Sequence, residues 1–243
     1  MDVAGVGKIT SGDYENINIS GLGTIPGNIS ANKVEISGKG KSLGYIDCKC
    51  LYVSGTFKGK ENVKSSEEIN ISGLAKFTSI YCNYINVNGK IALDKGLNFN
   101  KINMEGWLTV LKNCQGQEFI VDGKVNIKGL LSADIIDISL RGKSYIKEIG
   151  GEGILIKNGG GVTIKIFNLA KTISPYMECE LIEGDRVDIE NTRCKIIRGE
   201  NITIREGCII DKIECSGKLN INEKSKVLDI IYINENKLNY NSV

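Results

Sequence analysis

The sequence predicts an all-β fold, a parallel β-helix (solenoid) of about twelve coils with a period of about 17 residues. Two observations predict this fold. A short strand pattern that ends in glycine, first clear at Ile17-Asn18-Ile19-Ser20-Gly21, returns along most of the chain. The composition is also that of strands and turns, because the chain holds 29 glycines, only 2 prolines and few strong helix formers.

The period is measured on the second apolar residue of each copy of the pattern. Successive spacings between these residues are 17, 17, 18, 16, 17, 17, 17 and 18. A unit of this size cannot bury its own apolar face, so neighbouring units must stack and pair their backbones about 4.8 Å apart. The residues that we expect to stack in one column are Ile19, Ile36, Val53, Ile71, Val87, Met104, Val121, Ile138 and Ile156.

Two further features of the repeat predict the corners of each coil. The glycine after each strand, such as Gly38, is expected to adopt a positive φ where the chain turns. Small residues recur eleven or twelve positions after the column residues, which predicts a tight inward corner. These small residues are Ala31, Cys48, Ser65, Cys82 and Ala133.

The repeat divides the chain into four parts. Residues 1–157 are regular coils, with an incomplete coil at the start, and coils resume over residues 183–233. Residues 158–182 break the period and form an irregular insertion. The last residues, 234–243, are predicted to be a flexible tail.

The insertion is expected to be a short amphipathic helix or a hydrophobic loop. Ile166, Leu169 and Ile173 have helical spacing, and Pro175 would end such a helix. The segment either pads the side of the rod or docks a partner or a membrane surface. Its candidate contact residues are Ile166, Phe167, Leu169, Ile173 and Met177.

Composition argues against several function classes. Charge is nearly balanced, at 31 Lys and Arg against 29 Asp and Glu, so we expect no nucleic-acid partner. The chain has no histidine, the commonest general base and metal ligand. Its eight cysteines form no C-x-x-C pair, so they are interpreted as reduced thiols, and Cys48 and Cys82 as small buried hydrophobes. We therefore predict no catalytic residue, no metal, no cofactor and no small-molecule substrate.

The sequence also bears on location. The first residues, Met1-Asp2-Val3-Ala4-Gly5, lack the basic and apolar regions of an export signal. No apolar run approaches the roughly 20 residues of a membrane span. We therefore expect a cytoplasmic protein with reduced thiols, associated with a membrane only through a partner.

Two stretches resemble bactofilins, the polymer-forming cytoskeletal proteins of bacteria. The first is Val34-Glu35-Ile36-Ser37-Gly38 with the following Ile46-Asp47-Cys48, and the second runs from Leu181 to Cys208. The second is similar to the longer bactofilin-like proteins of Gram-positive bacteria. The resemblance implies a right-handed β-helix, non-polar filaments that need no nucleotide, and scaffold roles in cell shape, motility or envelope organisation.

The open ends of a β-helix offer unpaired strand edges and a slice of apolar core. We therefore expect end-to-end self-association, alone or with a paralogous subunit, and a membrane-associated or envelope protein as a further partner. The predicted polymerisation residues are Val6, Ile9, Ile17, Ile19, Leu219, Ile221, Ile230 and Ile231.

Two alternatives remain open at this stage. One is a non-filamentous adaptor that binds a partner through residues 164–177. The other is a polysaccharide-active β-helix enzyme, which needs clustered carboxylates or basic groups on one face. The candidate clusters are Asp134, Asp137, Arg141 and Lys143, or Asp185, Asp188 and Arg193. A left-handed acyltransferase is disfavoured, since such enzymes typically use a histidine base and the chain has none.

Overall fold

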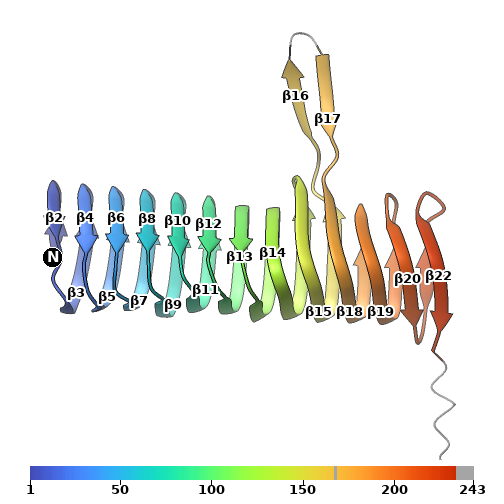
Figure 1. Ribbon diagram of the computed structural model, residues 1–243, viewed down its shortest axis with the longest axis horizontal. Helices are drawn as coiled ribbons and strands as arrows, with labels where there is room; N and C mark the ends of the chain where they lie inside the picture. The colour runs from blue at the N-terminus through green and yellow to red at the C-terminus, as the bar shows by residue number, and fades with distance from the viewer. Residues whose placement is uncertain (167–168, 234–243) are drawn as a thin grey trace, which may run out of the picture.

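The computed structural model describes residues 1–166 and 169–233, which form strands and turns with no helix. Twenty strands belong to one sheet that winds into a straight solenoid of about 13 turns, with a period of about 17 residues (Figure 1). Two more strands, β16 and β17, form a separate hairpin. The predicted all-β solenoid is confirmed.

The strands follow one another in chain order with short turns between them. Their bounds are β1 (Asp2–Val3), β2 (Val6–Lys8), β3 (Gly12–Ile19), β4 (Leu22–Ile25), β5 (Ile29–Ile36), β6 (Lys39–Ser42), β7 (Ile46–Val53), β8 (Thr56–Gly59), β9 (Val63–Ile71), β10 (Leu74–Phe77), β11 (Ile80–Val87), β12 (Lys90–Leu93), β13 (Leu97–Val110), β14 (Cys114–Leu140), β15 (Lys143–Asn158), β16 (Val162–Ile166), β17 (Leu169–Ile173), β18 (Tyr176–Ile189), β19 (Thr192–Ile204), β20 (Ile209–Cys215), β21 (Leu219–Ile221) and β22 (Lys226–Tyr232).

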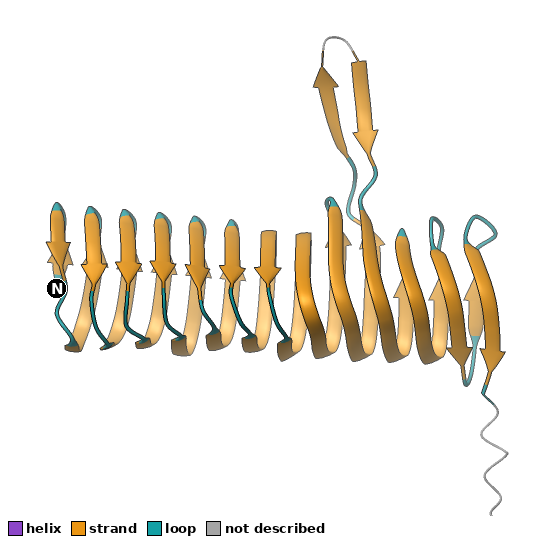
Figure 2. Cartoon of the chain, viewed as in Figure 1, coloured by secondary structure: helices purple, strands orange, loops and turns teal. Residues whose placement is uncertain are grey.

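In the N-terminal half, each turn holds one long strand and one short strand, and these form two layers of the rod (Figure 2). Long strands pair in parallel with long strands, as β3, β5 and β7 do, while short strands pair with short strands. Buried and exposed residues alternate along each strand, as expected for one face against the core and one in water. Further along, strands such as β14 continue through both layers.

The predicted column of stacked aliphatic residues is present and extends further than the regular repeat. Ile19 pairs with Ile36, and the ladder continues turn by turn to Met104 and Val121. Beyond the insertion, Ile156 pairs with Ile189, so the register crosses the break. The ladder then runs through Ile204 to Ile221. All of these side chains except Ile221 belong to one continuous hydrophobic core.

The predicted small-residue corner is also confirmed. Ala31 pairs with Cys48, Cys48 with Ser65, and Ser65 with Cys82, and all four are buried. Hydrogen bonds hold the corner together, because the Ser65 hydroxyl donates to the backbone oxygens of Lys49 at 2.6 Å and of Glu68 at 3.0 Å.

The prediction that the corner glycines adopt a positive φ was wrong for most of them. Gly106 has a positive φ of 140°, but Gly21, Gly38 and Gly55 do not. Glycine is required instead by the close approach of successive turns. A Cβ on Gly38 would lie far inside van der Waals contact with the backbone oxygen of Gly21, and Gly55 stands in the same relation to Gly38.

The expectation of a helix or loop in the insertion was also wrong. β16 and β17 form an antiparallel hairpin in which Val162 pairs with Ile173 and Ile166 with Leu169. Because Ile166 and Leu169 lie on opposite strands, their spacing of three reflects a chain reversal and not a helical face. The solenoid resumes at Tyr176, which pairs with Lys143, so the insertion ends earlier than residue 182. The predicted tail at 234–243 lies outside the described residues.

Candidate functional site

The N-terminal end of the rod is formed by β1 and β2, which pair on one side only with β3 and β4. Of the residues predicted to form this end, Ile9, Ile17 and Ile19 are buried inside the core. Tyr14 packs on that core, and its hydroxyl donates to the backbone oxygen of Thr10 at 2.9 Å. A charge introduced at these isoleucines would therefore disrupt the fold itself.

The C-terminal end of the described chain is more open. β22 pairs with β20, and β21 pairs with β19, each on one side. Ile230 pairs with the fully buried Ile213 yet is itself 40% exposed. Ile221 is 38% exposed and Ile231 is also exposed, while Leu219 is partly buried. Ile221 and Ile230 thus belong to rows that face the core in the preceding turns but reach the solvent in the last one, whereas Ile231 pairs with Glu214 and lies outside those rows.

The predicted contact residues of the insertion fall in different parts of the structure. Ile166 ends β16, and Leu169 and Ile173 begin and end β17, so all three belong to the hairpin. Met177 lies in β18 and is fully buried in the solenoid core, which makes it a core residue. Phe167 lies outside the described residues.

Three of the four charged groups of the first candidate enzyme site are engaged with residues outside that site. Asp134 is exposed. The other three are paired across neighbouring turns: Asp137 with Lys157 (Oδ2–Nζ 3.1 Å), Arg141 with Asp122 (Nε–Oδ1 2.5 Å, Nη2–Oδ2 2.8 Å), and Lys143 with Glu178 (3.2 Å). Hydrogen bonds from Arg141 hold the pKa of Asp122 below its ordinary value.

The second candidate site is dispersed in the same way. Asp188 accepts two hydrogen bonds from Arg205, from Nε at 2.6 Å and from Nη2 at 2.5 Å. Arg193 lies over the ring of Tyr176, 5.0 Å from its centroid. Asp185 is exposed on β18. Both carboxylate clusters therefore resolve into ion pairs and exposed single charges along the surface of the rod.

Seven of the eight cysteines are buried, and Cys50 is half-buried. Burial raises the pKa of the Cys114 thiol, and the same effect is the main cause of the raised pKa values of Cys48 and Cys82. At neutral pH these thiols stay protonated, which makes them poor nucleophiles and poor metal ligands.

Sequence reasoning missed a basic surface on the outer side of the short strands. We call it the lysine face, and it comprises the outward residues of β2, β4, β6, β8, β10 and β12 and of segments 107–110, 124–127 and 143–146. These nine stretches hold no Asp or Glu. Their lysines, all exposed, are Lys8, Lys39, Lys41, Lys58, Lys76, Lys90, Lys124 and Lys143.

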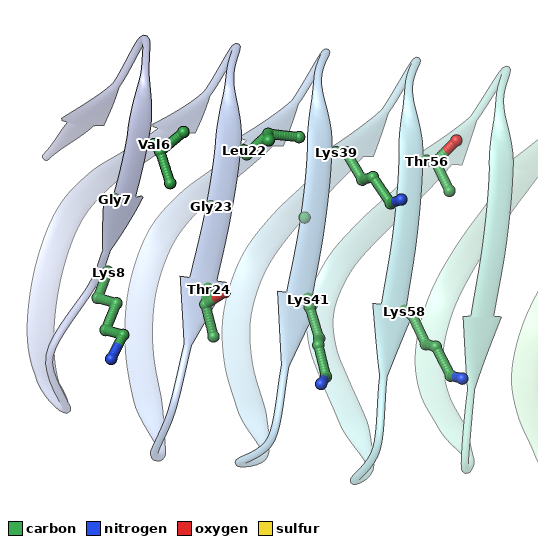
Figure 3. Close-up of a pocket in the computed structure, with 11 residues that line it drawn as sticks. Val6, Gly7, Lys8, Leu22, Gly23, Thr24, Lys39, Lys41, Thr56 and Lys58 are labelled. Carbon is green, nitrogen blue, oxygen red and sulfur yellow. The ribbon is translucent and has the colours of Figure 1, made fainter.

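The lysines are aligned by the register of the sheet. Lys41 pairs with Lys58, and Lys58 pairs with Lys76, so three like charges occupy successive turns. Figure 3 shows Lys8, Lys39, Lys41 and Lys58 on neighbouring strands, around a shallow groove of about 590 Å³. The nearly zero net charge concealed this face, but adding up charge at each position of the 17-residue period would have found it.

Comparison with known proteins gives two relatives from Bacillus subtilis (strain 168). The chain is 31% identical over 234 residues to the uncharacterized protein YhbF, which covers 93% of this chain and 97% of YhbF. The chain belongs to the YhbF family. It is also 36% identical over 92 residues to the uncharacterized protein YhbE, but that match spans only 37% of this chain and 38% of YhbE. No family model matches the chain, and no solved structure matches it.

Since the YhbF match covers nearly all of both chains, membership in the YhbF family concerns the solenoid as a whole. Within residues 1–166 and 169–233 of this YhbF-family protein, no helix could cross a bilayer. The same residues contain no group of three or more Cys, Asp or Glu side chains arranged to hold a metal ion.

Proposed function

We propose that this YhbF-family protein is a structural scaffold that assembles end to end into filaments, as bactofilins do, without nucleotide. A β-solenoid is compatible with such a role. One observation carries the proposal, namely that core-facing residues such as Ile221 and Ile230 are exposed at the C-terminal end of the described chain. Covering them with the end of another copy buries apolar surface, and this burial alone can drive association.

The strand edges support the same proposal. Among the described residues, β22 has a partner on one side only, and at the other end of the rod β1 and β2 do as well. An unpaired parallel strand is a template for another strand, and within the described residues no helix covers either edge. The filaments would organise cell shape, motility or envelope machinery from the cytoplasm, through a membrane-associated or envelope protein partner.

The test is negative-stain electron microscopy of the purified chain, with Ile230→Lys as the variant. Ile230 is 40% exposed, so lysine is tolerated in the monomer but places an unpaired charge in the end-to-end contact. Filaments are expected for the wild type and short or single units for the variant. Leu228→Lys is the matched control, because Leu228 is an exposed side chain of the same strand β22 that lies outside the row of core residues reaching Ile230. Wild-type protein that stays monomeric at high concentration would refute autonomous assembly.

A second candidate is an adaptor that binds a partner through the β16–β17 hairpin. The observation that favours it is that the hairpin forms a sheet of its own and stands out from the rod (Figure 1). Capture of a partner by the wild type, and not by a hairpin deletion, would support the adaptor, and filaments need not form.

A further inference from the structure

We propose that the lysine face is a docking surface for an anionic lipid bilayer, so that the rod lies flat on a membrane without an intermediary protein. This inference goes beyond the scaffold role and depends on a different surface. It rests on three properties of that face: uncompensated charge, exposed apolar side chains between the charges, and straightness.

The charge is uncompensated over most of the face. Within the described part of the chain, two of its lysines form ion pairs, Lys76 with Asp94 at 2.8 Å and Lys143 with Glu178 at 3.2 Å. Lys41, Lys58 and Lys76 stack on successive turns about 4.8 Å apart, and like charges directly opposite one another in a sheet are destabilising. An external anionic surface would offset this repulsion.

Apolar and aromatic side chains lie among the lysines, in one register row of the face. From Val6 and Leu22 the row continues through Lys39, Thr56, Leu74 and Lys90 to Trp107. Its four apolar members are exposed, Val6 at 87%, Leu22 at 51%, Leu74 at 53% and Trp107 at 54%. Trp107 has the Lys90 ammonium 5.1 Å and the Lys124 ammonium 5.6 Å from its ring. Tryptophan between lysines suits the boundary of a bilayer, where the ring enters the interface and the ammonium groups meet the headgroups.

Two other anionic partners fit less well. A straight, flat face cannot follow the grooves of a duplex, and no stretch of it contains arginine, the commonest base-reading residue. A second copy could offer its long-strand face. However, some carboxylates of that face are already paired with cations of the same chain, as Glu35 is with Lys33 and Glu118 with Lys101. The lipid surface is therefore the occupant that the lysine face favours.

The experiment is vesicle flotation of the full chain, which separates membrane binding from filament sedimentation. Vesicles of equal parts phosphatidylcholine and phosphatidylglycerol are compared with phosphatidylcholine alone. Binding is expected only to the anionic vesicles and is expected to weaken with salt. Because Trp107 is the only tryptophan, its emission should shift to the blue on binding. Flotation without a change in Trp107 emission would place the contact elsewhere and overturn the proposal.

Two charge-reversal variants distinguish the effect of charge on the lysine face from the effect of the net charge of the protein. Lys41→Glu/Lys58→Glu should weaken binding on the order of 30-fold or more, since each lysine near an anionic surface contributes about fivefold. The matched control is Lys49→Glu/Lys64→Glu, which changes the net charge equally through exposed lysines of β7 and β9. Equal loss in both variants would contradict the proposal. So would a wild type that ignores vesicles but binds duplex DNA or bundles with itself.

Discussion

Gly40 lies directly beneath the ring of Phe57 on the next short strand. The two are register partners, and a Cβ on Gly40 would come 2.7 Å from Cδ2 of that ring. Phe57 is buried and packs against Phe77, with ring centroids 5.5 Å apart and the rings tilted by 50°. Gly59, the glycine nearest Phe77, makes a similar space, since its Cβ would lie 3.1 Å from the ring. The core of the rod is thus filled by large residues that occupy the space left by small ones.

The first prediction concerns this Gly40–Phe57 pair. Gly40→Ala overpacks the site and should cost about 1–3 kcal/mol, whereas Phe57→Ala leaves a cavity and should cost about 3–5 kcal/mol. In the double variant the alanine methyl enters the space vacated by the ring, so the combined loss should be smaller than the sum. Urea denaturation of all four proteins measures this coupling. Strict additivity would contradict the packing described.

A second prediction concerns the corner glycines. Gly55→Ala should destabilise the solenoid by about 2–4 kcal/mol, because the added Cβ meets the backbone oxygen of Gly38 and backbone cannot move aside as a side chain can. The control is Gly5→Ala, since nothing lies within 4 Å of a Cβ at that position. Thermal unfolding followed by circular dichroism compares them. Equal melting temperatures would show that successive turns are less tightly apposed.

Much of this fold could be predicted because the same pattern of apolar and small residues recurs in every turn of a solenoid. The spacing from Ile19 to Ile156 determined the stacking, and the small residues at Ala31 and Cys48 determined a corner. The physical reason for the corner glycines could not be inferred from the sequence, since a close approach of successive turns and a positive φ both favour glycine. The hairpin was missed because spacings of three and four also occur across a chain reversal, as between Ile166 and Leu169.

The candidate sites were harder to predict, because they depend on which face and which turn a residue occupies. Ile19 and Ile221 carry the same side chain in the same row of the ladder, yet Ile19 is buried and Ile221 is 38% exposed. Ile19 has Val3 on one side and Ile36 on the other, whereas among the described residues Ile221 pairs with Ile204 alone. The lysine face is similar, because Lys41 and Lys58 are unremarkable singly and become a row only when the turns are stacked.

A third prediction concerns alkaline pH. Burial raises the pKa of Cys48 to about 12 and that of Cys82 to about 11, from an ordinary value of 9.0. The folded state therefore holds these protons more tightly than the unfolded chain. Their contribution to stability is complete below pH 9 and is lost as the pH rises toward 11. Each thiol should lower the free energy of unfolding by about 1.4 kcal/mol per pH unit in that window.

Lysines and tyrosines also titrate at high pH, so the thiol effect is measured as a difference between variants. Cys48→Ala/Cys82→Ala should show a shallower loss of melting temperature from pH 9 to pH 11 than the wild type.

In native protein near pH 8, a thiol reagent should label the half-buried Cys50 first, and all eight cysteines should react in denaturant. Rapid native labelling of Cys48 would disagree with its burial.

The last prediction separates the solenoid from its hairpin. Replacing residues 160–174 by a short Gly-Ser linker should leave the rod folded, because β15, which precedes the insertion, pairs directly with β18, which follows it. This pairing extends from Lys143 and Tyr176 to Ile156 and Ile189. Each turn of a solenoid is stabilised by its neighbours, and the hairpin contributes no strand to that stack. The melting temperature should therefore change little, and filaments should still form if the ends drive assembly.

Ile230→Lys should give the opposite outcome, a folded rod that retains the hairpin but forms no filaments. A deletion that unfolds the chain would show that the hairpin supports the solenoid, and one that abolishes filaments alone would place the assembly contact on the hairpin instead of the ends.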